Sequence, residues 1–385
     1  MTQAIDQRRY DIDWLRTLAF FVLILYHLAM YYVADWGWHI KSTEQSVWLQ
    51  NLMVLTNPWR MSLLFFISAM AMSLVMRRHK FSALNLVKLR SKRLLIPLVF
   101  SMLVVVPPQL FYELKQFYGF TEGYVVFMQE YLDINTQLVP QKQSPIGLLT
   151  WNHLWFLPYL WCYSMLLLLI YLPLEKLSNA MSKNKIPPWC AFIILLLGTA
   201  MSWLFLSDKF PTTHGLLDDW FNHARYFWVF ILGFMLPRVS HLWQRLVDCR
   251  RAMLILALIG YAWLLMDRHG WLNVGEELDK LWLIQFAHSI LISFNHWAWI
   301  LALVGYAGRY LQFTNKFLSY ANRAILPWYI LHQTAIVVFA GYLSAWDIPV
   351  WFEVLLLISS TFLGCFLGYE LVRRNRLLKL LFGVK

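Results

Sequence analysis

Residues 11–33 read DIDWLRTLAFFVLILYHLAMYYV, a long apolar run with ionisable side chains inside it. About 20 consecutive apolar residues have the length of a helix that crosses a bilayer. We therefore predict a transmembrane helix over Asp13–Val33. Asp13, Arg16 and His27 are unusual in such a segment, because charge inside a bilayer is costly and normally faces a partner or a watered cavity.

Arg16 and His27 are predicted to lie on one face of this helix. Their spacing corresponds to a rise of about 16 Å and ends about 20° from a whole number of turns. Asp13, one turn before Arg16, can pair with it. One interpretation is that the arginine reaches the headgroups and the histidine only packs. The other is a functional site, which the shared face and an imidazole suited to proton transfer favour.

The composition places the chain in the membrane. Of 385 residues, 59% are hydrophobic and 14% are charged, whereas about a quarter of a soluble domain is charged. Long continuous apolar runs exclude a β-barrel, whose strands alternate in short segments. We predict an all-α polytopic membrane protein, a single domain over residues 1–385, with about ten helices around a central cavity. The predicted spans are Asp13–Val33, Met61–Met76, Leu94–Tyr112, His153–Pro173, Trp189–Leu206, Ala224–Leu236, Ala252–Met266, Leu281–Gly305, Ala324–Ala345 and Val350–Val372.

The formal net charge of +12 does not indicate a nucleic-acid partner. Most Lys and Arg residues fall in alternate connecting segments and in the C-terminal tail, while the other segments are acidic. This asymmetry predicts that both termini are cytoplasmic. The first span reads as an uncleaved helix, since no small-residue cleavage site follows it. The cysteines are scattered, so neither a disulfide framework nor a metal site is predicted.

Aromatic residues are frequent in two segments predicted to lie outside, 34–60 and 113–152. They fit an interfacial aromatic belt. They also fit a groove in which sugars stack on rings beside carboxylates. Both interpretations stay open.

Three further polar constellations stand out. Arg90 and Arg93 are one turn apart on a helix predicted to enter the membrane from inside; they suit the phosphates of a nucleotide-like donor, or reflect positive-inside bias. His153 and Trp155 stand at a helix start, with Asn152 as the predicted cap. His332 lies within the ninth span, where Pro327 is expected to turn the helix. Some buried polar residues of this kind merely bond neighbouring helices.

These residues resemble the acyltransferase-3 family of membrane-bound acyltransferases. Arg16 followed eleven positions later by His27 is similar to its first-span signature. The other similar motifs are Phe65-Phe66-Ile67-Ser68, Arg90-x-x-Arg93-x-x-x-Pro97 and Tyr329-Ile330-Leu331-His332. Ala69 replaces the glycine expected after Ser68. Further motifs look like a subgroup understood to place succinyl groups on periplasmic glucans: Ser46-x-Trp48-Leu49, Arg60-Met61, Pro108-Gln109 and His153-Leu154-Trp155-Phe156-Leu157.

The resemblance implies O-acyl transfer across a bacterial inner membrane, from cytoplasmic succinyl-CoA or acetyl-CoA to a periplasmic glucan or another glycan. Catalysis would fall to His27, with Arg16 and Asp13. Arg90, Arg93 and Ser68 would hold the donor. His153, Trp155 and His332 would bind the acceptor.

Acyl-CoA would be a substrate, with no permanently bound cofactor or metal. The expected partners are acyl-CoA, a glycan and membrane lipid, and a homodimer stays open. The competing interpretations are a transporter or flippase of a glycan or lipid-linked intermediate, and a structural partner of a glycan synthase.

Overall fold

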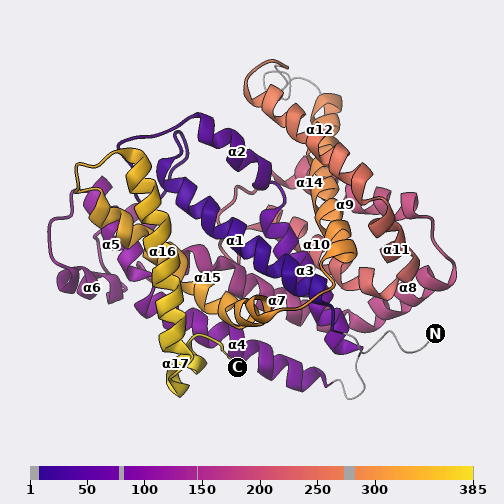
Figure 1. Ribbon diagram of the computed structural model, residues 1–385, viewed down its shortest axis with the longest axis horizontal. Coiled ribbons are helices and arrows are strands. Elements are labelled where there is room, and N and C mark those ends of the chain that lie inside the picture. The colour runs from indigo at the N-terminus through magenta and orange to yellow at the C-terminus, as the bar shows by residue number, and fades with distance from the viewer. Residues whose placement is uncertain (1–7, 78–81, 145, 273–281, 385) are drawn as a thin grey trace. The chain divides into compact units, whose positions relative to one another are not determined.

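The computed structural model describes residues 8–77, 82–144, 146–272 and 282–384. Within these ranges the chain forms helices and no named strand, which confirms the all-α prediction (Figure 1). Each of the ten predicted spans is mainly helical, although Leu94–Tyr112 and His153–Pro173 each contain a break between helices, and Leu281 lies outside the described residues. The elements are α1 (Tyr10–Tyr32), α2 (Trp48–Thr56), α3 (Arg60–Met76), α4 (Ala83–Val104), α5 (Pro107–Phe117), α6 (Tyr124–Leu132), η2 (Pro140–Lys142), η3 (Asn152–Trp155), α7 (Phe156–Leu169), α8 (Tyr171–Lys183), α9 (Pro188–Leu206), α10 (Trp220–Met235), η4 (Leu236–Arg238), α11 (Ser240–Asp248), α12 (Arg250–Arg268), α14 (Trp282–Tyr310), α15 (Lys316–Leu343), α16 (Val350–Val372) and α17 (Arg376–Leu381).

Seven helical segments of the described chain are long and apolar enough to cross a membrane, and the number rises to nine if two bent pairs each count as one span. One pair is residues 152–169 with α8, bent by 74°, and the other is α11 with α12, bent by 64°. These helices support a polytopic membrane protein. The predicted span that is not among these nine is Ala224–Leu236, which lies mainly in α10, a helix of 16 residues that is short for a span. The count of ten spans stays a prediction.

Prolines mark the start of one helix, but Pro327 does not interrupt the helix that contains it. The predicted span Leu94–Tyr112 consists of α4 and α5, and α5 begins with Pro107 and Pro108. Proline lacks the amide hydrogen that a continuing helix needs but fits the first turn of a new one. Pro327, in contrast, lies inside α15, which runs unbroken from Lys316 to Leu343.

The chain packs into two compact units. Unit 1 consists of residues 1–19, 51–84 and 162–319, and unit 2 of residues 20–50, 85–161 and 320–385. Helix α1 contributes its first part to unit 1 and its second part to unit 2. The single domain predicted over residues 1–385 stays a prediction.

In unit 1, α3 and α10 approach closely at a glycine. A Cβ added to Gly233 on α10 would lie 2.4 Å from the carbonyl oxygen of Phe66 on α3, so a larger side chain there would force the two backbones apart. Ala69, which stands where a family glycine was expected, is fully buried on α3. Gly233 therefore supplies a close contact on the facing helix.

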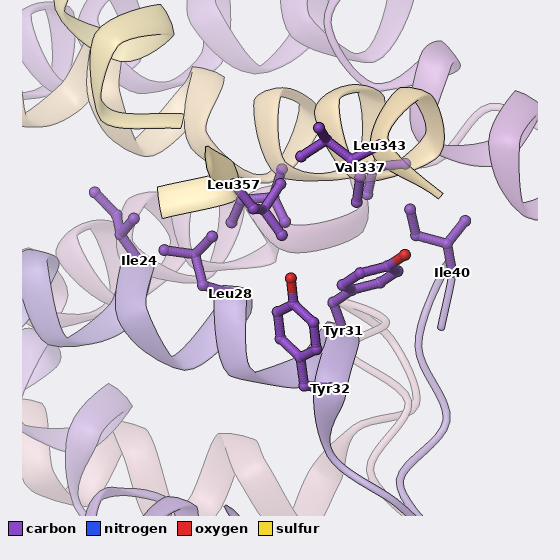
Figure 2. Close-up of a cluster of buried hydrophobic side chains, with 10 residues drawn as sticks. Ile24, Leu28, Tyr31, Tyr32, Ile40, Val337, Leu343 and Leu357 are labelled. Carbon is purple, nitrogen blue, oxygen red and sulfur yellow. The ribbon is translucent and has the colours of Figure 1, made fainter. Parts of the chain in front are cut away.

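The core of unit 2 joins the end of α1 to α15 and α16. Figure 2 shows Ile24 and Leu28 on α1 facing Leu357 on α16, with Tyr31 lying toward Ile40. The rings of Tyr31 and Tyr32 meet edge to face, with centroids 4.8 Å apart. This packing holds the second part of α1, which carries His27.

Lys41 closes the C-terminal end of α1. Its Nζ donates to the carbonyl oxygens of Met30 (2.8 Å), Trp36 (3.1 Å) and Val33. The last carbonyls of a helix have no partner within the helix, and three acceptors require the three hydrogens of an ammonium group. Burial lowers the pKa of Lys41, while the Asp35 carboxylate opposes this shift.

Replacing Lys41 should therefore loosen the end of α1. We expect Lys41→Met to reduce the stability of unit 2 by about 2 kcal/mol, because charge-assisted hydrogen bonds to backbone carbonyls at the end of α1 and just after it are lost. Amide hydrogen exchange of residues 28–33 measures the effect. Lys209→Met, on an exposed lysine, is the matched control, and equal exchange in both variants would contradict the capping role.

Candidate active site

Two histidines from distant parts of the chain meet in unit 2. Nδ1 of His27, on α1, lies 2.7 Å from Nε2 of His332, on α15. The two rings are parallel within 6°, and their centroids are 5.0 Å apart. His332 is fully buried, whereas His27 is partly buried. The structure thus brings together two residues that the sequence placed in different predicted roles.

The hydrogen bonds assign the hydrogens of this pair. Nδ1 of His332 lies 2.7 Å from the carbonyl oxygen of Tyr329, and a carbonyl only accepts, so Nδ1 carries a hydrogen. In a neutral ring, Nε2 of His332 must then accept, and Nδ1–H of His27 donates to it. If Nε2 of His332 donated to His27 instead, both ring nitrogens of His332 would have to carry a hydrogen, and the ring would be charged. A neutral His27 therefore has its lone pair on Nε2, the atom that accepts a proton.

His153, on η3, stands beside this pair. Its ring centroid lies 5.2 Å from that of His332, edge to face. Its Nε2 donates to the carbonyl oxygen of Ile330 (3.2 Å), and its Nδ1 accepts from the amide of Gln109 (3.3 Å). Both ring nitrogens of His153 and of His332 are thus engaged. The acceptor-binding role predicted for them would require one of these bonds to open.

Gln109, on α5, connects the elements around the histidines. Its amide nitrogen donates to Thr334 (2.7 Å) as well as to His153, and its oxygen accepts from Asn152 (3.0 Å) and Gln333 (2.9 Å). The side chain is fully buried, and these four bonds use its full donor and acceptor capacity. Gln109 therefore fixes η3 and α15 relative to α5.

The predicted role of Asn152 as a helix cap is wrong. The residue before η3 is Trp151, without a side-chain cap bond, and Asn152 is the first residue of η3 with φ at 47°. Asparagine tolerates this left-handed conformation better than most residues. Its side chain donates to Gln109 instead of capping a helix.

We expect Gln109→Leu to destabilise unit 2 strongly. Leucine leaves buried partners without a hydrogen bond, at about 1–3 kcal/mol for each one that finds no substitute. The thermal unfolding midpoint should fall by several degrees. Gln129→Leu, an identical change on the exposed side of α6, should leave the midpoint unchanged. An unaltered midpoint in Gln109→Leu would disprove the role of Gln109.

Asp13 and Arg16 form the ion pair that their spacing predicts. Oδ1 of Asp13 lies 3.1 Å from the guanidinium of Arg16, and Oδ2 lies 2.8 Å from that of Arg8. The carboxylate therefore balances two arginines near the start of α1. Both residues belong to unit 1, while His27 belongs to unit 2.

The remaining predicted site residues lie in both units. Arg90 and Arg93 are partly buried on α4 in unit 2, one turn apart as predicted. Trp155 is buried in unit 2, with its ring 5.1 Å from that of Tyr159. Ser68 is partly buried on α3 in unit 1. Their donor and acceptor roles stay predictions.

The segment after α5 folds over a core of its own, rather than forming an open aromatic groove throughout. Tyr131 is fully buried there, donates to the carbonyl oxygen of Met102 (2.8 Å), and has its pKa raised to about 12 by burial. Tyr118 and Tyr124 remain exposed. Sugar stacking in this segment is thus open to these two tyrosines and not to Tyr131.

A charged cluster lies beside this segment. The Glu113 carboxylate contacts Nδ1 of His39 at 2.7 Å and also pairs with Lys142. The backbone of Lys41 exchanges two hydrogen bonds with the side chain of Gln116. These bonds tie the segment after α1 to α5. In the described part of the chain, no group of three or more His, Cys, Asp or Glu residues could hold a metal ion.

The comparisons with known proteins define the class. The model of an acyltransferase domain family, Acyl_transf_3, matches residues 9–370. The chain belongs to this acyltransferase family.

Among individual proteins, the chain is similar to "Glucans biosynthesis protein C" of Escherichia coli (strain K12) and of Shigella dysenteriae serotype 1 (strain Sd197). Each is 25% identical to it over 98% of this chain and 95% of the relative. No solved structure matches the chain.

Proposed function

We propose that this protein transfers an acyl group from acyl-CoA to a hydroxyl of a glycan on the far side of the bacterial inner membrane. The His27–His332 pair carries the proposal, because it orients a proton acceptor inside a chain of an acyltransferase family. The name of the 25% identical relatives supports a glucan as acceptor. Succinyl is the favoured acyl group, and acetyl is the alternative.

In the proposed reaction, Nε2 of His27 takes the proton from the acceptor hydroxyl as its oxygen attacks the thioester carbonyl. The new C–O bond forms, the C–S bond breaks, and the leaving thiolate of CoA recovers the proton from the imidazolium. His332 positions the ring of His27 through its Nε2. An alternative mechanism, in which the acyl group is first transferred to His27 and then to the acceptor, is also compatible with this geometry.

The donor is proposed to enter from the cytoplasm. Arg90 and Arg93 would bind its phosphates, since guanidinium groups pair with phosphate through two hydrogen bonds at once. Asp13 and Arg16, at the other end of α1 from His27, are proposed to orient the pantetheine arm. The proposed topology has ten spans and both termini in the cytoplasm.

CoA binding tests the donor. We expect CoA to raise the thermal unfolding midpoint of the purified protein, increasingly with concentration. The double variant Arg90→Gln/Arg93→Gln should bind CoA about tenfold or more weakly, because charge-assisted bonds are lost. Lys183→Gln, on the exposed end of α8, should bind CoA normally. A midpoint that CoA leaves unchanged would refute an acyl-CoA donor.

Mass spectrometry of periplasmic glycans, with and without the protein, tests the product. A succinyl or acetyl increment that depends on the protein would identify donor and acceptor together. Glycans of identical mass in both strains would refute the proposed acceptor.

A further inference from the structure

Unit 1 contains an apolar cavity that the proposed chemistry does not use. Its volume is about 330 Å³, which is within the range of small-ligand sites. Ile194 and Leu195 on α9 line it from one side, and Leu242 and Leu246 on α11 line it from another. Helices α3, α8, α10, α12 and α14 complete the wall. The lining is apolar except for Arg245 and the weakly polar thiol of Cys249.

Helix α11 has the geometry of a helix at a membrane surface. It has nine residues and meets α12 at an angle of 64°, while the pair together is apolar enough for one span. Leu242 and Leu246, one turn apart, point to the cavity, and Gln244 and Asp248 are exposed on the other side. A helix with one apolar and one polar face, bent away from a span, suits the boundary between headgroups and acyl chains.

Arg245 places a positive charge at the wall of this cavity. The residue is exposed on α11. In the described ranges of the chain, no carboxylate forms an ion pair with its guanidinium. Arg250 and Arg251 follow at the start of α12. Basic residues of this kind at the cytoplasmic surface attract anionic lipid headgroups.

The cavity and the charge together identify the occupant. An apolar lining offers no hydrogen bonds to a sugar or a peptide, whereas it matches a hydrocarbon chain. Acetyl and succinyl groups are short or charged, so neither needs such a cavity. We propose that the cavity holds an acyl chain of an anionic phospholipid, whose phosphate pairs with Arg245.

Lipid binding by the full chain tests this site. The purified protein is titrated in detergent with palmitoyl-oleoyl phosphatidylglycerol, which is anionic, or with the zwitterionic phosphatidylcholine of the same chains. Bound lipid is counted by native mass spectrometry. We expect phosphatidylglycerol to bind about fivefold more tightly, as one arginine near the headgroup provides. Equal affinity for both lipids would overturn the proposal.

Two variants separate the headgroup contact from the cavity. Arg245→Gln should abolish the preference for phosphatidylglycerol and retain chain binding. Ala191→Phe adds a ring to the cavity wall and should reduce binding of both lipids. Arg268→Gln, the same change on an exposed residue at the far end of α12, should preserve the preference. If it also abolishes the preference, the selectivity arises from net charge and the site is refuted.

A cross-linking measurement avoids dependence on the folding of Ala191→Phe. Phosphatidylglycerol with a photoreactive group at its chain end is irradiated with the unaltered protein, and the labelled peptides are sequenced. Labels on residues 191–195 and 242–253 are expected. Labels distributed over the apolar surface, without enrichment in these segments, would overturn the proposal. Neither outcome depends on acyl transfer, so the test is independent of the proposed function.

Discussion

Acyl transfer should fall by about 10²- to 10⁴-fold in His27→Ala, the usual contribution of a general base. The loss is expected because alanine lacks Nε2. The hydrogen bond from Nδ1 of His27 to His332 leaves Nε2 as the proton-accepting atom of neutral His27. The measurement is transfer of labelled acyl groups from acyl-CoA, the proposed donor, to the proposed glycan acceptor, with protein reconstituted in vesicles.

Two variants make the result interpretable. His27→Asn retains a side-chain amide where Nδ1 lay, so it can still donate to His332 and keep the packing, but it has no basic nitrogen. It should lose as much activity as His27→Ala at an unaltered thermal midpoint. His269→Ala, on an exposed histidine after α12, should transfer normally. Full activity in His27→Asn would show that another group removes the proton.

His332→Ala should lower acyl transfer by about 100-fold, the order expected when a reacting group is no longer held in place. Alanine removes the acceptor for Nδ1–H of His27, and the imidazole can then turn or change its tautomer. His332 is a positioning residue in this account, so the loss should appear in kcat more than in KM.

His332→Gln distinguishes positioning from a purely structural role. The side-chain oxygen of glutamine lies about where Nε2 was and can accept from His27. We expect His332→Gln to recover activity to within about tenfold of the unaltered protein. Equal losses in His332→Gln and His332→Ala, tracking equal falls in thermal midpoint, would show that His332 only supports the fold.

The helices were predictable because long apolar runs in lipid have few alternatives to helix. Eight of the ten predicted spans lie in a single α-helix apart from a few end residues, whereas Leu94–Tyr112 and His153–Pro173 each contain a break. Asp13 pairs with Arg16, as their spacing predicts. The break between α4 and α5 was missed, because Leu94–Tyr112 was predicted as one span, although Pro107 and Pro108 were a usable signal for a new helix start.

The assembly of the site was not predictable from local rules. His27 and His332 were singled out separately, but 305 positions separate them, and no sequence period reports such a contact. Gln333 and Thr334 were missed, although Gln333 next to His332 inside an apolar span was a usable signal. Gln109 belongs to a motif of the sequence, but its four hydrogen bonds depend on α5, η3 and α15 lying together.

The saturated side chain of Gln109 has a consequence for the evolution of this enzyme. Because each of its donors and acceptors already has a protein partner, Gln109 has nothing left with which to recognise a substrate. Selection for a new acyl group or sugar should therefore act on neighbouring positions and leave this glutamine unchanged. In a mutational library screened for altered specificity, position 109 should stay invariant while the residues that face the substrate diversify.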